Sequence, residues 1–152
     1  YGFGTLHPSP AQAPVCVVER VIDGDTVLCA GGVRVREIGI DAPELSQDPH
    51  GQLARAAHLR ITPPGARLRI DTDVEQRDRY GRLLAYLWTQ DGRLVAQQLA
   101  AEGYVLQATI PPNVRHADRI RAAVAAAREA GRGLWRTGGF DCAPRDRRAR
   151  RC

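Results

Sequence analysis

Residues 15–28 read VCVVERVIDGDTVL, in which two β-rich runs lie on either side of Asp23-Gly24. An Asp-Gly pair between two such runs is typical of a tight hairpin turn. Further β-rich runs follow in the chain, at residues 33–40, 67–74 and 83–88. The run at 67–74 alternates apolar and polar residues, as a half-buried strand does. The sequence therefore predicts five short strands, of which the first two form a hairpin.

The spacing of apolar residues predicts three helices, at residues 52–61, 95–102 and 113–130. Asn113 is a candidate N-cap for the last helix, which Gly131 would end. Five short strands with one inserted helix and two trailing helices suit an OB-type barrel. The expected fold class is mixed α+β, mainly β: a five-stranded OB-type barrel with about three α-helices.

The chain of 152 residues, 43% hydrophobic and 26% charged, has the length and composition of one globular domain. Residues 1–14 contain three prolines and read as a flexible lead-in. We expect the folded domain to cover residues 15–140. An arginine-rich tail with two cysteines would follow it at 141–152.

The net charge of +5 favours an anionic partner, of which nucleic acid is the commonest. Residues 145–151 hold five arginines and one aspartate, so the tail accounts for most of this charge. Such a tail is either solvated or adds phosphate affinity that falls with salt. Lysine is absent, so every basic side chain that meets a phosphate is a guanidinium.

The four cysteines allow three pairings in two disulfides. Cys16 and Cys29 flank the predicted hairpin turn, and Cys142 and Cys152 would close the tail into a loop. We expect these two pairings, with other pairings and free thiols left open. No two cysteines have the spacing of a zinc site.

Localisation follows from the same cysteines and from the chain's start. Disulfides favour a secreted or extracytoplasmic protein. The chain begins at Tyr1 and lacks methionine, which we interpret as processing or trimming, with a secretory signal removed. The longest apolar stretch, 122–127, is too short to span a bilayer.

Four short motifs carry the chemistry of the chain. They are Asp23-Gly24-Asp25-Thr26, Arg36, Asp41-Ala42-Pro43-Glu44 and Asp78-Arg79-Tyr80-Gly81-Arg82. Taken singly, each motif is compatible with a hairpin turn or the end of a strand. Taken together, they offer carboxylates for a hard cation and arginines for a phosphate. These are the groups that metal-assisted phosphodiester cleavage needs.

The order of these motifs, followed by a helix ending in Gly-Leu-Trp, resembles the staphylococcal (micrococcal) nuclease family, whose members are also called thermonucleases. The resemblance covers residues 17–135 and implies an OB-type nuclease domain. It implies a calcium-dependent hydrolase of DNA and RNA that uses in-line attack by water and leaves 3′-phosphate ends. We expect such a protein to be a monomer.

The resemblance also implies a role for each matching residue. The metal ligands would be Asp25, Asp41 and the backbone carbonyl of Ala42, and Glu44 would act on the attacking water. The scissile phosphate would be bound by Arg36 and Arg82, and a neighbouring phosphate by Arg79 and Tyr80. Calcium accepts such a mixed set of oxygen ligands, and only arginine can pair two phosphate oxygens at once. Asp23 and Thr26 look like supporting residues.

Two segments depart from the family's pattern. The best-studied members carry two tyrosines that stack on the nucleotide, where this chain has residues 107–112, QATIPP, without an aromatic. The loop at 45–51 is shorter than in those members. Base affinity depends on such stacking, at about 1–3 kcal/mol per base.

Two other functions remain open at this stage. The first alternative is a non-catalytic nucleic-acid-binding module of the same fold. The presence of all five residues expected to carry the chemistry weighs against it. The second alternative is an exported scaffold whose tail binds an anionic polymer.

Overall fold

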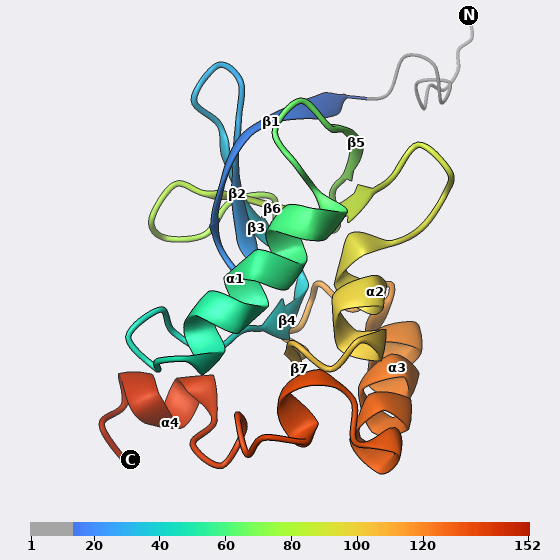
Figure 1. Ribbon diagram of the computed structural model, residues 1–152. Helices are drawn as coiled ribbons and strands as arrows, with labels where there is room; N and C mark the ends of the chain where they lie inside the picture. Colours follow the sequence, from blue (N-terminus) through green and yellow to red (C-terminus); the bar gives the residue numbers. More distant parts are fainter. Residues whose placement is uncertain (1–13) are drawn as a thin grey trace, which may run out of the picture.

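The computed structural model describes residues 14–152, and five of its strands close into a barrel (Figure 1). In barrel order these strands are β1 (Val15–Asp23), β2 (Thr26–Cys29), β3 (Arg34–Glu37), β6 (Leu83–Trp88) and β5 (Arg67–Asp71). Only the β3–β6 pair is parallel among these ladders. The five-stranded OB-type barrel predicted from the sequence is confirmed. The lead-in predicted at 1–14 lies, except for its last residue, outside the described residues.

The β-rich run at 33–40 is two strands rather than one. β3 ends at Glu37, and β4 (Gly39–Asp41) leaves the barrel to pair antiparallel with β7 (Leu106–Ala108). Gly39 lies between them with a φ of 90°, a backbone conformation that glycine adopts without strain. A Cβ there would meet Ile120 Cδ1 at 2.7 Å. This bend turns the chain so that Asp41 ends β4 beside the β1–β2 turn.

The helices are α1 (His50–Ile61), α2 (Val95–Ala101), α3 (Ala117–Ala130) and α4 (Pro144–Arg148), with a 3₁₀ turn at Gly133–Trp135. The prediction of Asn113 as the N-cap of the third helix is wrong, because α3 begins after His116. The amide of Asn113 instead accepts from the Glu75 backbone N–H at 2.8 Å and donates to the Glu75 carbonyl at 2.9 Å. The tail helix α4 and the strand β7 were not predicted.

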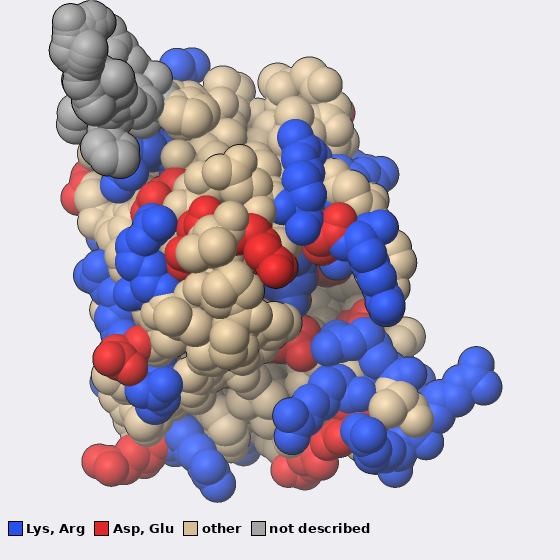
Figure 2. Space-filling model, turned by 180° about the vertical axis from the view of Figure 1, so that it is seen from behind, with Lys and Arg blue, Asp and Glu red and all other residues tan. Residues whose placement is uncertain are grey.

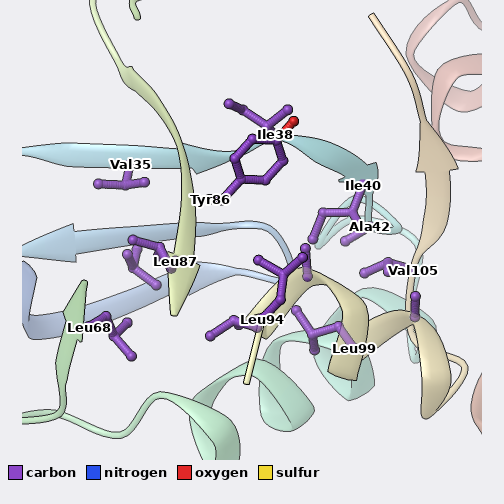
Figure 3. Close-up of a cluster of buried hydrophobic side chains, with 14 of the residues drawn as sticks. Val35, Ile38, Ile40, Ala42, Leu68, Tyr86, Leu87, Leu94, Leu99 and Val105 are labelled. Carbon is purple, nitrogen blue, oxygen red and sulfur yellow. The ribbon is translucent and has the colours of Figure 1, made fainter. Parts of the chain in front are cut away.

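The core fills the barrel and continues below it, against α2 (Figure 3). Leu68 and Leu87 lie in the barrel, and Leu99 of α2 lies beneath. Ala42, just after β4, belongs to the same cluster. A Cβ on Gly24 would lie 2.5 Å from the Cβ of Ala42. The β1–β2 turn therefore packs directly against the segment that follows β4, which brings two of the predicted motifs together.

Two disulfides join the expected cysteines. Cys16–Cys29 links β1 to β2, and Cys142–Cys152 closes the tail around α4. Both predicted pairings are confirmed. No helix within residues 14–152 has the length and apolar character needed to cross a membrane.

Candidate functional site

One hollow of about 310 Å³ collects the predicted site residues at the end of the barrel. Its lining includes all eight of them, together with Asp23, Pro43 and Arg148: Asp25, Arg36, Asp41, Ala42, Glu44, Arg79, Tyr80 and Arg82. We call this hollow the recess. In Figure 2 it opens on the right-hand side of the view, among blue and red side chains. Motifs that are far apart in the sequence thus share one small volume.

Two nearly buried carboxylates face one guanidinium in the recess. Asp25 is 7% exposed and Asp41 is 8% exposed. Arg36 Nη2 lies 3.5 Å from Asp25 Oδ2 and 3.5 Å from Asp41 Oδ1. The backbone N–H of Ala42 also donates to Asp25 Oδ2, at 2.9 Å. These contacts fix the β1–β2 turn against the end of β4.

The charge of Arg36 decides which acid in the turn is ionised. Burial raises the pKa of Asp25, but Arg36 and three hydrogen bonds outweigh burial and hold it below its ordinary value. Burial, and then the neighbouring charge of Asp25, raise the pKa of Asp23 to about 7. Two carboxyls this close titrate as a pair. Asp25 is therefore the member that ionises first, and Asp23 keeps its proton up to a pH of about 7.

Asp78 organises the segment that carries Arg79, Tyr80 and Arg82. Its Oδ1 accepts from the backbone N–H groups of Tyr80 and Arg82, each at 2.9 Å. Its Oδ2 accepts from Arg82 Nε at 2.7 Å. Burial raises the pKa of Asp78, but these hydrogen bonds outweigh it and leave the pKa below its ordinary value. Asp78 thus holds Arg82 in a fixed direction with its two Nη groups free of that carboxylate.

Tyr80 is 69% exposed and lies on Arg79, whose Nη2 donates to the tyrosine hydroxyl at 2.9 Å. The neighbouring hollow of about 490 Å³ is lined by Tyr80 and Arg82, and also by Ala108 and Ile110. Ile110 is largely exposed. The segment that lacks tyrosines therefore offers an aliphatic surface in the hollow that Tyr80 also lines.

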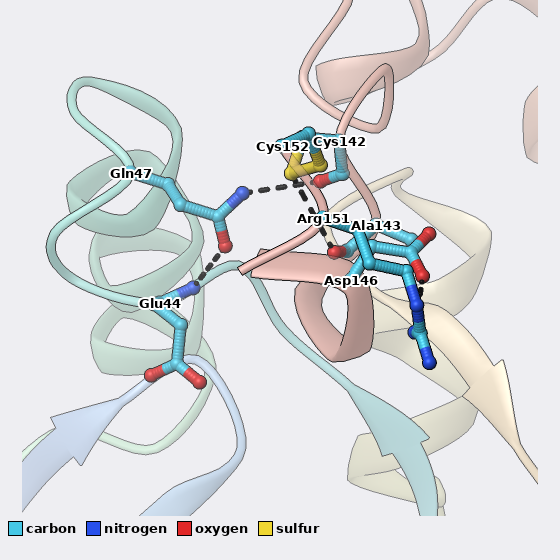
Figure 4. The surroundings of a disulfide bond; sticks show 7 residues. All are labelled: Glu44, Gln47, Cys142, Ala143, Asp146, Arg151 and Cys152. Atoms are coloured by element: carbon cyan, nitrogen blue, oxygen red, sulfur yellow. Dashed lines mark hydrogen bonds and ion pairs between the residues drawn. A yellow bond between two sulfur atoms is a disulfide. The ribbon is translucent and has the colours of Figure 1, made fainter. Parts of the chain in front are cut away.

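Glu44 and the segment after it are tied to the tail. Gln47 accepts from the backbone N–H of Glu44 at 2.8 Å and donates to the carbonyl of Cys142 at 3.1 Å (Figure 4). The short loop at 45–51 thus rests on the loop that the Cys142–Cys152 disulfide closes.

Arg148 of α4 is a residue of the recess that the sequence did not reveal. Its Nη2 lies 2.8 Å from Asp41 Oδ2, and its Nη1 lies 3.2 Å from Asp41 Oδ1 and 2.9 Å from Glu44 Oε1. The sequence predicts a tail that is either solvated or adds nonspecific phosphate affinity, whereas Arg148 is bound to two acids of the recess. The two cysteines that flank its arginines were the one signal in the sequence that this segment is held in place.

The donor set of the recess fits a hard cation. No group of three or more His, Cys, Asp and Glu side chains suited to a metal occurs in the part of the chain that the structure describes. Asp25 and Asp41 nevertheless present oxygen ligands whose charge is balanced only by guanidinium groups. A cation can take over that balance. Calcium accepts carboxylates, backbone carbonyls and water together, so the two acids and the Ala42 carbonyl are suitable ligands.

Comparison with known proteins places the chain in a family. Residues 34–137 match the sequence model described as "Staphylococcal nuclease homologue". The chain is 35% identical to the thermonuclease of Staphylococcus intermedius over 130 residues, which cover 78% of this chain and 74% of the relative. It is 32% identical to the thermonuclease of Staphylococcus hyicus over 141 residues, 88% of this chain and 82% of the relative.

A third relative is much longer than this chain. Endonuclease YhcR of Bacillus subtilis is 31% identical over 135 residues, which cover 78% of this chain but only 11% of YhcR. On this sequence match and on its closed OB-type barrel, the chain belongs to the staphylococcal nuclease family.

Proposed function

We propose that this protein is a calcium-dependent nuclease that hydrolyses phosphodiester bonds of DNA and RNA and leaves 3′-phosphate ends. The observation that carries the proposal is the arrangement of Arg36 between the buried carboxylates of Asp25 and Asp41. Glu44 and Arg82 line the same recess. The names of the relatives, thermonuclease and endonuclease, support this activity.

The chain's own residues divide the work between phosphate and water. Arg36 and Arg82 would bind the scissile phosphate and neutralise the charge that grows on its oxygens. Glu44 would orient the attacking water and accept its proton, while the 5′ oxygen leaves in line with the attack. Held by Asp25, Asp41 and the Ala42 carbonyl, calcium would supply Lewis-acid polarisation of a phosphoryl oxygen.

Digestion of plasmid DNA and of RNA tests this proposal. We expect cleavage with calcium, none with chelator, and a loss of about 100-fold or more in Glu44→Gln, the usual contribution of a general base. Glu19→Gln, an exposed acid on β1, is the matched control. Full activity in chelator contradicts the metal role, and 5′-phosphate ends contradict the proposed cleavage side. Binding without cleavage favours the non-catalytic module.

Arg148 should compete with the cation for Asp41. Because its guanidinium takes both oxygens of that carboxylate, a cation must displace it. A half-exposed pair of this kind is worth about 1 kcal/mol, so Arg148→Gln is expected to bind calcium roughly three- to tenfold more tightly. Calorimetric titration without nucleic acid measures this, with Arg147→Gln on the same helix as the control. Equal calcium affinity in the two variants contradicts the competition.

We also propose that the protein works as a monomer in an oxidising, extracytoplasmic compartment. The two disulfides support this location, because disulfides persist in such compartments. Thiol titration of the protein isolated from its native source tests it, and four free thiols would contradict it.

A further inference from the structure

A second and larger hollow, of about 1030 Å³, opens beside the recess. It lies between α3, β7 and α4, and it shares Asp41 and Arg148 with the recess. We call this hollow the tail groove. Its volume is at the upper end of sites for small ligands, roughly 300–1,000 Å³, so it has room for a stretch of polymer. The two hollows therefore meet at Asp41 and Arg148.

The rim of the tail groove is rich in guanidinium groups from two different elements. Arg121 and Arg128 come from α3, and Arg145 comes from α4 on the opposite wall. Arg128 lies over the ring of Trp135, 5.4 Å from its centroid, and Arg121 pairs with Asp118 at the surface. Glu129 is the one carboxylate besides Asp41 among the lining residues. Positive charge therefore exceeds negative charge along the groove, in the form that best binds phosphate.

The floor of the tail groove is apolar, with Leu106, Val124 and Trp135 among its residues. An apolar floor between arginine walls suits a single strand, whose bases are free to leave the stack while its phosphates meet the arginines. A duplex hides its bases and would leave such a floor uncovered.

The outer wall of the tail groove is formed by α4, in the tail of the chain. α4 begins at Pro144, beyond residues 34–137 that match the family. The Cys142–Cys152 disulfide and the hydrogen bond from Gln47 to Cys142 hold this wall against the rest of the protein. In Figure 2, arginines gather densely in the lower right of the view, below the recess.

We propose that the tail groove binds the sugar-phosphate backbone of a single-stranded substrate on one side of the cleaved bond. The inference rests on the proposed nuclease function, because the cleaved bond of the nucleic acid lies in the recess and the rest of the single strand continues from there. Arg121, Arg128 and Arg145 each contact a phosphate, and the strand passes Asp41 on its way from the recess. An acidic peptide is the competing occupant.

Three Arg→Gln changes, at Arg121, Arg128 and Arg145, test the proposal. Glutamine keeps the Cβ and Cγ groups of the stem and removes the guanidinium, including the one of Arg128 that lies over Trp135. The probe is a fluorescein-labelled single strand of about 16 nucleotides, the upper end of what one OB fold covers. Binding is measured by anisotropy with calcium in a Glu44→Gln background, across a series of salt concentrations. The matched control is Arg67→Gln with Arg93→Gln, two exposed arginines that do not line the groove.

Each phosphate contact in a single strand contributes about 0.7 to the slope of log K against log salt. The triple variant is therefore expected to lose about 2 from that slope, and the control to lose none. With Glu44 restored, the groove variant should lose at least tenfold in kcat/KM on the long strand and much less on a dinucleotide. Equal slopes in groove and control variants overturn the proposal, as does an equal loss on both substrates.

The outcomes separate this inference from the proposed function. A wild-type protein that cleaves neither substrate overturns the nuclease, while the salt slope still reports on the groove. A wild-type protein that cleaves both, with groove variants that match the control, overturns the groove alone. Displacement of the DNA by a polyglutamate peptide at lower concentration than by unlabelled strand would assign the groove to acidic peptide.

Discussion

The change Arg36→Ala is expected to lower kcat for phosphodiester cleavage about 100- to 1000-fold, the usual cost of removing one preorganised charge partner. Arg36 is the arginine that lies near both candidate ligands, 3.5 Å from an oxygen of Asp25 and of Asp41. A phosphate oxygen that lies beside a cation held by these two acids would therefore be near this guanidinium. Arg36→Lys should recover only part of the loss, because an ammonium cannot pair two oxygens in one plane.

Single-turnover cleavage of a labelled oligonucleotide measures the effect, with Arg34→Ala as the control. Arg34 lies on the same strand two residues earlier and is exposed. Arg36 also holds the two carboxylates, so calcium affinity is measured beside kcat. If Arg36 acts on the phosphate, kcat falls while calcium binds as tightly as before or more tightly, since a competing positive charge has gone. A kcat within threefold of wild type contradicts the role, and a parallel loss of calcium affinity would make Arg36 a structural clamp.

Much of this fold could be predicted because its strands are β-rich runs that turn signals interrupt. The run at 83–88 is a strand with the bounds expected, and the Asp23-Gly24 turn joins two antiparallel strands. The run at 33–40 was predicted as one strand because its residues are β-rich on both sides of Gly39. In the structure the chain leaves the barrel at Gly39, whose positive φ separates β3 from β4.

Short elements held by distant contacts could not be predicted. β7 has three residues and is defined by its pairing with β4, and α4 has five residues inside a disulfide loop. Asn113 has a side chain suited to an N-cap, but its amide forms hydrogen bonds with the backbone of Glu75, 38 residues away in the sequence. In each case a tertiary contact overrides the local preference.

The candidate site was likewise predictable only in part. The resemblance implies that the residues of the four motifs lie close together, and in the structure they line one recess. Arg148 follows no motif and reaches Glu44 across 104 residues of sequence. Its contacts with Asp41 and Glu44 place it in the recess, and the hydrogen bond from Gln47 holds the tail loop there. The roles of all these residues stay predictions until the variants are measured.

The buried pair of Glu37 and His58 is expected to contribute strongly to the stability of the fold. Neither side chain is exposed, and His58 Nε2 lies 2.5 Å from Glu37 Oε2. His58 Nδ1 lies 2.7 Å from the carbonyl oxygen of Asp23, so the charged ring can donate at both nitrogens. The pair thereby links α1 to the strand of Arg36 and to the turn of Asp25. We expect His58→Ala to lower the free energy of unfolding by about 3–5 kcal/mol, because it leaves a carboxylate buried without its partner.

Urea unfolding measures this cost, and the exposed pair of Arg60 and Glu102 supplies the control. Glu102→Gln breaks a pair at the surface and is expected to cost about 0–1 kcal/mol. Glu37→Leu combined with His58→Leu should cost less than His58→Ala, since no charge is then left alone in the core. A double variant that is less stable than the single one would contradict a cost that arises from the unpaired charge.

The same pair predicts how stability depends on pH. Burial lowers the pKa of His58, but the charge and hydrogen bond of Glu37 outweigh it, so the pKa lies above its ordinary 6.5. The folded protein therefore holds a proton that the unfolded chain releases near pH 6.5. The contribution of this proton to stability is complete below that pH and is lost as the pH rises through the higher folded pKa. Urea midpoints from pH 6 upward should fall in wild type and change less in the double leucine variant. Parallel pH profiles of the two proteins would show that His58 does not carry this charge in the folded state.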